Sequence, residues 1–247
     1  MRKAVRSLAA AIAFLTRIPV GRWVDLSSED VSRSEGWFPV VGLLVGQIEC
    51  AVAWLLLPHL PAAVTAVLLV VLDVLLTGAL HYDGLADSAD GFGGGKSRDD
   101  ILRIMRDHAI GSYGGVALVL AVGMKIAALA ALLGGAAWPR PLIAAPMLGR
   151  WAILLLSAAL PYARQTASVV VGMGRKALVW GSLFTAAVLL AYRDPLVWIA
   201  AAVVLAIAAI LGLYYRRRIG GVTGDTLGAC AEIGEIAVLV VFVWRAG

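Results

Sequence analysis

Long apolar segments alternate with short polar connections along most of the chain, and this pattern predicts an all-α membrane protein. Each apolar segment is about 20 residues long, the length that a helix needs to cross the hydrocarbon core of a bilayer. Seven such segments are predicted, at 37–57, 62–80, 114–133, 142–160, 177–192, 196–214 and 226–244. The expected fold is therefore a polytopic bundle of about seven transmembrane helices that forms a single domain over residues 1–247.

A shorter apolar run near the N-terminus differs from these segments. Residues 8–15 follow a basic start, as in a signal peptide, but Thr16 and Arg17 stand where a small-residue cleavage site is required. We expect this run to be retained as a helix that lies at the membrane interface. The alternative is that it crosses the membrane as an eighth span.

The composition agrees with a membrane protein and gives it an orientation. Hydrophobic residues make up 61% of the chain and charged residues only 15%, whereas soluble domains carry about 25% charged residues. Sixteen of the 21 lysines and arginines fall on one predicted side, in the N-terminal segment and the connections 82–110, 162–176 and 215–225. The positive-inside rule places that side in the cytoplasm, and it explains the net charge of +5 without nucleic acid.

The connection 82–110 is unusually acidic for this chain and holds six of its sixteen acidic residues. Asp83, Asp87 and Asp90 follow one another at i, i+4 and i+7, so they share a helix face within roughly 60°. Like charges at this spacing repel, and a divalent cation with oxygen ligands, Mg²⁺ or Mn²⁺, is the simplest counter-charge. The alternative is a solvated polar face just outside the membrane.

Four glycines follow the aspartates, at positions 91, 93, 94 and 95. They are expected to break the helix, which begins again near Ser97. Glycine lets a backbone approach a phosphate closely, and free N–H groups at a helix start attract anions. With Lys96 and Arg98 nearby, the stretch predicts a site for metal-bound phosphates.

Two further sets of acids extend this hypothesis. Asp107 is expected on the second helix, as another ligand or base, or as part of an ion-pair chain with Asp100 and Arg103. Near the C-terminus, a second glycine-rich acidic segment, 220–235, contains Asp225, Glu232 and Glu235. The two glutamates interrupt an apolar span, which is costly, so they are expected to act in the site or to pair with Lys125 or Arg150.

Five stretches of the chain resemble one known family along nearly its whole length. They are FLTRIPV (14–20), GWFPVVGLLVG (36–46), HYDGLADSADGFGGG (81–95), RIMRDHAIGSYG (103–114) and GGVTGDTLGACAEIGE (220–235). The family is cobalamin synthase, the integral-membrane adenosylcobinamide-GDP ribazoletransferase. One departure is visible, because His108-Ala109 stands where the family is expected to have a Ser-Arg pair, and this removes one phosphate-binding arginine.

The resemblance implies a Mg²⁺-dependent transfer from adenosylcobinamide-GDP to α-ribazole or its 5′-phosphate, with GMP as the leaving group, in a bacterial inner membrane. It implies that Asp83, Asp87, Asp90 and Asp107 are the metal-binding and catalytic residues. Substrate binding is expected from two groups of residues: Gly93, Gly94, Lys96, Arg98 and Arg103 in the first segment, and Asp225, Glu232 and Glu235 in the second. A homo-oligomer is compatible with the sequence.

Two other functions are considered. An ion-coupled transporter could line a pathway with Asp73, Glu232 and Glu235, but transporters place their sites near the midplane, and most acids here lie in connections. A CDP-alcohol phosphotransferase shares the chemistry, but its motif has an Ala-Arg pair where this chain has Ala86-Asp87. Both are therefore ranked below the ribazoletransferase.

Overall fold

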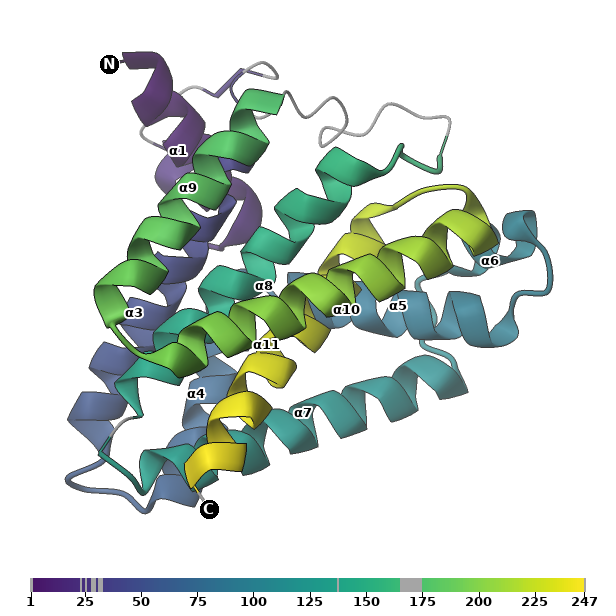
Figure 1. Ribbon diagram of the computed structural model, residues 1–247. Coiled ribbons are helices and arrows are strands. Elements are labelled where there is room, and N and C mark those ends of the chain that lie inside the picture. Colours follow the sequence, from purple (N-terminus) through teal and green to yellow (C-terminus); the bar gives the residue numbers. More distant parts are fainter. Residues whose placement is uncertain are drawn as a thin grey trace.

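The structure, a computed structural model, is built of helices (Figure 1). It describes residues 2–246 except 23, 25, 28–29, 31–32, 137 and 165–174. The elements are α1 (Arg2–Leu15), η1 (Val20–Arg22), η2 (Glu35–Trp37), α3 (Phe38–Leu56), α4 (Ala62–Thr77), α5 (Leu80–Gly94), α6 (Arg98–Ile104), α7 (Ser112–Leu133), α8 (Pro139–Ala159), α9 (Arg175–Tyr192), α10 (Pro195–Ile219) and α11 (Gly224–Ala246). The predicted all-α membrane bundle is confirmed.

All seven predicted apolar segments are helical, but they are not equivalent as spans. Five helices are each long and apolar enough to cross a membrane, namely α3, α7, α8, α10 and α11. A sixth span is possible only if α4 and α5, which meet at 89°, cross together as a bent pair. The apolar part of α9 is shorter, at Lys176–Tyr192. The chain is a multi-pass membrane protein with five or six such spans, rather than seven.

Small residues allow the closest helix contact of the bundle, between α3 and α8. A Cβ atom at Gly42 would lie 2.3 Å from the carbonyl oxygen of Pro146, and one at Gly46 would lie 2.6 Å from that of Leu142. Glycines four residues apart on one face let two helix backbones approach in this way within a membrane. This contact makes α3 and α8 a rigid pair.

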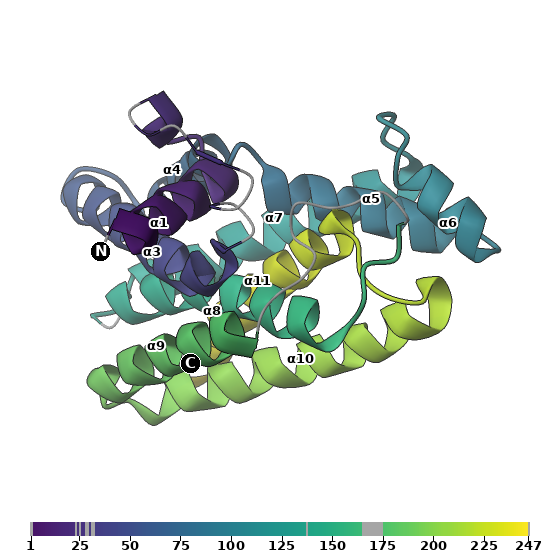
Figure 2. The ribbon, with the colours of Figure 1, turned by 90° about the horizontal axis from the view of Figure 1, so that it is seen from above.

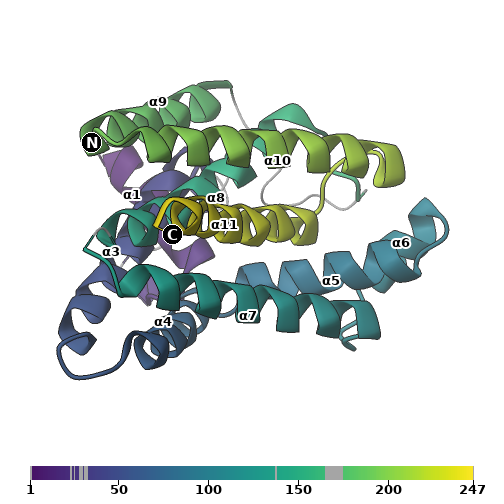
Figure 3. The same ribbon diagram turned by 60° about the horizontal axis from the view of Figure 1, so that its bottom comes forward.

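Helix α11 occupies the centre of the bundle. It packs against α8, α5, α10 and α7, and Figure 3 shows it between α10 on one side and α7 on the other. The predicted N-terminal helix is present as α1, whose Ala11 and Leu15 are buried while Val5 is exposed. Phe14 stacks on Phe38 and fastens α1 to α3 (Figure 2).

Three connections that the charge pattern assigned to one side meet at one end of the bundle. Arg98, at the start of α6, donates from Nε to the carbonyl oxygen of Ile219 (2.9 Å) and from Nη2 to that of Ala163 (2.6 Å). Ala163 N–H in turn donates to the Val222 carbonyl at 2.8 Å. The α5–α6 connection, the end of α8 and the α10–α11 turn therefore form one surface, called the acidic end below. Most of the predicted connection 162–176 lies outside the described residues.

Candidate active site

The acidic helix α5 begins after a sharp bend. Gly78 and Ala79 both have positive φ, 65° and 60°, and they turn α5 by 89° from α4. We expected the second apolar segment to continue straight into the aspartate face, and that prediction is wrong. The sequence gives little sign of the bend, because alanine rarely adopts a left-handed conformation. The bend lays α5 alongside both α7 and α11.

The three aspartates of α5 lie on one regular helix, as their spacing predicts, and are graded in burial. Asp83 is exposed, Asp87 is half-buried and Asp90 is buried. The helix does not break at Gly91 but continues to Gly94. Gly91 stays helical because Met105 packs directly onto it, so that a Cβ atom there would lie 2.6 Å from Met105 Cγ. Packing therefore overrides the low helix propensity of the glycines.

Asp90 has a defined structural partner in the start of α7. Its Oδ2 accepts the N–H of Gly111 at 2.7 Å, and its Oδ1 accepts the N–H of Gly114 at 2.8 Å. These N–H groups are among those that a helix start leaves unpaired, and a carboxylate there also interacts favourably with the helix dipole. Each oxygen keeps a further lone pair, so the cap leaves a metal-ligand role open.

Glycine at position 114 is required by this cap. A Cβ atom at Gly114 would lie 2.3 Å from Asp90 Oδ2 and 2.9 Å from the Ala86 carbonyl oxygen, whereas a Cβ atom at Gly115 would meet nothing within 4 Å. We expect Gly114→Ala to destabilise the protein by about 1–3 kcal/mol through overpacking. Gly115→Ala, the matched control, should be neutral or slightly stabilising because alanine favours the helix.

The measurement is the midpoint of thermal unfolding of each purified variant in detergent. A Gly114→Ala midpoint equal to that of Gly115→Ala would show that Asp90 does not hold the start of α7 in this way.

The start of α11 brings a fourth aspartate to this face. A Cβ atom at Gly84 would lie 2.7 Å from the carbonyl oxygen of Asp225 and 3.2 Å from Gly228 Cα, so α5 and α11 touch at their backbones. The charge of Asp87 consequently interacts with those of Asp83, Asp90 and Asp225. The structure thus brings together three of the four predicted metal ligands and Asp225.

Asp225 is held by a cation that the sequence did not single out. Arg164 Nη2 donates to Asp225 Oδ2 at 2.6 Å, and Thr223 Oγ1 donates to the same oxygen at 3.2 Å. The α11 start is also fixed by a reciprocal pair, since Thr223 N–H donates to Thr226 Oγ1 and Thr226 N–H to Thr223 Oγ1. By contrast, Asp83 and Asp87 have no hydrogen bond or ion pair within the described part of the chain. Two carboxylates are therefore available to a ligand.

A cavity of about 130 Å³ opens beside these acids. Its polar lining is His81, Asp83 and Asp225, and its apolar lining includes Phe14, Leu15, Phe38, Ile153 and Leu227. The Nε2 atom of His81 is buried without a hydrogen-bond partner in the described structure. A partly apolar recess with acids on one side suits a ligand that has both a ring system and a charged group.

The predicted phosphate-binding cations are arranged differently from one another. Lys96 and Arg103 are exposed, and Arg103 forms the expected i, i+3 pair with Asp100, at 3.9 Å. Arg98 already donates to the two backbone carbonyls that join the acidic end. Phosphate binding by these three residues stays a prediction.

The two glycines predicted to approach substrate are placed by packing as well. A Cβ atom at Gly93 would lie 2.5 Å from the ring of Tyr113, and one at Gly94 would lie 3.4 Å from Ile104 Cδ1. Both glycines are exposed on their other side. Contact with Tyr113 gives one reason for glycine at position 93, and substrate binding stays a prediction.

Asp107 is not on the restarted helix, as was predicted. Helix α6 begins after Ser97, as expected, but it ends at Ile104. Asp107 follows in an exposed turn, where its Oδ1 accepts the N–H of Ala109 at 3.1 Å. A short polar side chain that bonds its own backbone two residues on favours a turn over a helix. Its role as a metal ligand stays a prediction.

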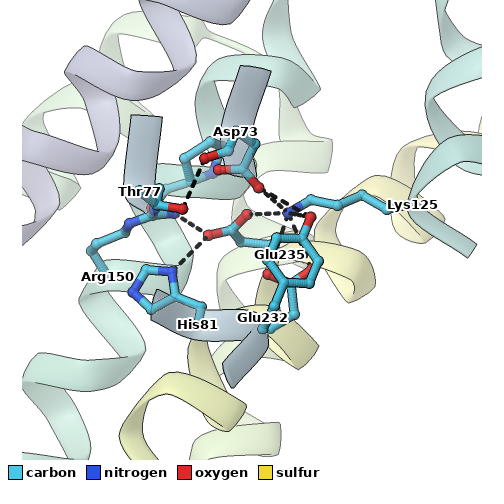
Figure 4. Close-up of polar contacts among 9 residues, drawn as sticks. Asp73, Thr77, His81, Lys125, Arg150, Glu232 and Glu235 are labelled. Carbon is cyan, nitrogen blue, oxygen red and sulfur yellow. Dashed lines mark hydrogen bonds and ion pairs between the residues drawn. The ribbon is translucent and has the colours of Figure 1, made fainter. Parts of the chain in front are cut away.

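Glu232 and Glu235 point away from this face into a buried ionic network (Figure 4). Lys125 Nζ lies 3.1 Å from Glu232 Oε1, 2.9 Å from Glu235 Oε2 and 2.8 Å from Asp73 Oδ2. Arg150, which is fully buried, pairs with the second oxygen of Glu235. The pairing with Lys125 or Arg150 that the sequence left open is therefore present for Glu235 with both cations and for Glu232 with Lys125. Direct contact of the two glutamates with substrate stays a prediction.

This network resembles a metal site in its acids but not in its centre. Asp73, Glu232 and Glu235 form the one acidic group in the described structure whose ligand atoms lie within 4.8 Å of one another. The ammonium of Lys125 occupies the position of the ion, and Tyr82 Oη adds a contact at 3.1 Å. Lys125 is thus the internal counter-charge that lets α4, α7 and α11 bury their acids together.

The fold and the site define a class: a multi-pass helical membrane protein that gathers unpaired carboxylates at one end of its bundle. The model of the cobalamin-5-phosphate synthase family matches residues 7–243. A protein of Ralstonia nicotianae, named adenosylcobinamide-GDP ribazoletransferase, is 40% identical over 99% of this chain and 97% of its own length. Relatives with the same name from Shewanella frigidimarina and Shewanella baltica are 36% and 35% identical over 94% and 98% of this chain, and 92% and 95% of their own. No solved structure matches the chain significantly.

The chain therefore belongs to the cobalamin-5-phosphate synthase family, a family of transferases in cobalamin biosynthesis. The family resemblance that the five sequence stretches indicated is confirmed. The comparisons favour neither a transporter nor a CDP-alcohol phosphotransferase.

Proposed function

We propose that this chain transfers the adenosylcobinamide-phosphate group of adenosylcobinamide-GDP to a ribose hydroxyl of α-ribazole, or of its 5′-phosphate, and releases GMP. The observation that carries this proposal is the full-length similarity to relatives named adenosylcobinamide-GDP ribazoletransferases. In the reaction the ribose oxygen forms a bond to phosphorus, the bond between that phosphorus and the GMP oxygen breaks, and the hydroxyl proton passes to a base.

The acidic end has the groups that such a reaction requires. Transfer of a phosphoryl group depends mainly on positioning and on neutralising the phosphate charge. Asp83 and Asp87 offer carboxylates with no protein partner, and the donor set is all oxygen, which suits Mg²⁺. Bound Mg²⁺ would supply the positive charge that a diphosphate needs. Asp90 and Asp107 complete the set of acids in the proposal.

The remaining roles follow from position. One of the α5 carboxylates accepts the proton of the ribose hydroxyl, because both a base and the metal must face the same phosphorus. Asp225 fixes Arg164 at the edge of the site, where its guanidinium steadies a phosphate. Glu232 and Glu235 act through the buried network, by holding α11 against α7.

The same proposal gives the protein an orientation. With the acidic end in the cytoplasm of a bacterial inner membrane, nucleotide substrate reaches the site directly. The basic residues gathered at this end, such as Arg216, Arg217 and Arg218 of the last turn of α10, agree with this orientation.

Turnover by the purified protein tests the proposal. We expect product and GMP from adenosylcobinamide-GDP and α-ribazole in liposomes with Mg²⁺, loss of product with EDTA, and recovery when Mg²⁺ is added back in excess. Activity that persists in EDTA would remove the metal from the mechanism. Absence of product from folded protein, with either acceptor, would overturn the transferase.

A further inference from the structure

The end of the bundle remote from the acidic end contains a second, larger cavity, of about 830 Å³. The end of α7, the start of α8, the α9–α10 link and the end of α11 contribute to its lining, which includes Leu132, Trp138, Arg140, Arg193, Asp194, Phe242 and Arg245. These elements approach one another at the end of the bundle away from α6 (Figure 3). The proposed reaction uses none of these residues.

The charge of this cavity is unusual for its location. Arg140, Arg193 and Arg245 are the three basic residues that the topology leaves on this side, and all three line the one cavity although they come from separate segments. The positive-inside rule predicts few cations here. Dispersed arginines would need no explanation, but their convergence requires a counter-charge.

The protein supplies only part of that counter-charge. Asp194 is the one acid among the described lining residues; it pairs with Arg140 at 2.8 Å and also caps α10 by accepting the Leu196 N–H. Arg193 and Arg245 form no ion pair with any described residue. Arg193 moreover has a φ of 50°, a conformation that residues other than glycine rarely adopt.

The surroundings indicate that the missing anion belongs to a lipid. Trp138 lines the cavity, while Trp198 and Trp244 are exposed on α10 and α11 beside it, and tryptophans in such positions mark the level of lipid headgroups. Exposed apolar side chains continue from there along the helices, including Ile199 and Val240. A molecule seated here would meet cations at its head and apolar surface along its tails.

We propose that this cavity binds the phosphodiester headgroup of an anionic phospholipid, such as phosphatidylglycerol, through Arg193 and Arg245. Arg140 orients the site but is already neutralised by Asp194. The first turn of α8 adds N–H groups that no side chain caps. The lipid bridges the ends of α8, α10 and α11, and it is distinct from any substrate at the acidic end, so this proposal does not depend on the proposed function.

Native mass spectrometry of the detergent-purified full chain tests the site. Phosphatidylglycerol and phosphatidylcholine are titrated separately into wild-type protein and into Arg193→Gln/Arg245→Gln. The matched control is Arg216→Gln/Arg217→Gln, which removes two exposed arginines from the opposite end. We expect the first double variant to bind its tightest phosphatidylglycerol roughly 10- to 30-fold more weakly than the wild type, because each arginine near a lipid surface contributes about 1 kcal/mol. The control should keep wild-type affinity, and phosphatidylcholine should not distinguish the proteins.

Two further arms keep the result decisive. Inorganic phosphate at the lipid concentration should not displace the lipid, and displacement would mean a site for a free anion instead. If the double variant does not fold, the wild-type preference for phosphatidylglycerol over phosphatidylcholine is measured at rising ionic strength, where it should fall. Equal phosphatidylglycerol binding by both double variants, or a preference unaffected by salt, overturns the proposal.

Discussion

Replacing Asp87 by Asn is expected to lower turnover by about 10²–10³-fold or more while leaving the fold intact, since removing one well-placed electrostatic group costs about that much in an active site. Asp87 lies at the centre of the acidic face, between the charges of Asp83, Asp90 and Asp225. It makes no hydrogen bond or ion pair within the described chain, so its charge is stabilised by nothing in the protein except the more distant Arg164. A carboxylate kept in this position is explained by a bound cation.

The matched control is Asp99→Asn, which removes the same charge from the same acidic end. The Asp99 side chain is 92% exposed and pairs only with Arg98, at 3.5 Å. We expect it to retain turnover within a factor of about two, as an exposed ion pair contributes little. Both variants should unfold at the wild-type temperature. Near-normal turnover of Asp87→Asn over a range of Mg²⁺ concentrations would remove this residue from the site.

The largest effect on stability is expected from Lys125→Met. The ammonium of Lys125 contacts the carboxylates of Asp73, Glu232 and Glu235, and the side chain is 6% exposed. Removing one partner of a buried ionic group typically costs about 3–5 kcal/mol, because the other charges remain buried without compensation. For a protein of this size, that corresponds to a drop of roughly 6–20 °C in the unfolding midpoint. The measurement is thermal unfolding in detergent.

A compensating variant separates lost charge balance from lost packing. Asp73→Asn and Glu232→Gln, added to Lys125→Met, leave Glu235 paired with Arg150 and remove the other two buried charges. This triple variant should recover most of the lost stability. Lys176→Met, at an exposed lysine of α9, should have little effect. If the triple variant is as unstable as Lys125→Met alone, the network stabilises the bundle through shape rather than charge.

The two experiments divide the acids of this chain into two groups. Asp83 and Asp87 lie at the surface of the acidic end and are expected to matter for turnover alone. Asp73, Glu232 and Glu235 lie inside the bundle and are expected to matter first for folding. Asp90 combines both properties, because it caps α7 and also faces Asp87.

Patterns local to one segment were read correctly from the sequence. The apolar segments predicted every long helix, and the i, i+4, i+7 spacing placed Asp83, Asp87 and Asp90 on one face of α5. The motifs identified the family, and the order of the segments put the second acidic stretch near the first. These features depend on neighbouring residues or on length, which a single sequence contains directly.

Contacts between distant segments were decided by the tertiary structure. The bend at Gly78 and Ala79, the cap that Asp90 provides for α7, and the position of Lys125 among three acids all involve partners far apart in the chain. Sequence spacing states which residues share a helix face, but not which other helix will cover that face. A charged residue in a span signals that a partner exists, and only the packed bundle shows that Glu232 and Glu235 meet a lysine and an arginine, because low-dielectric burial requires each charge to be matched where the helices happen to cross.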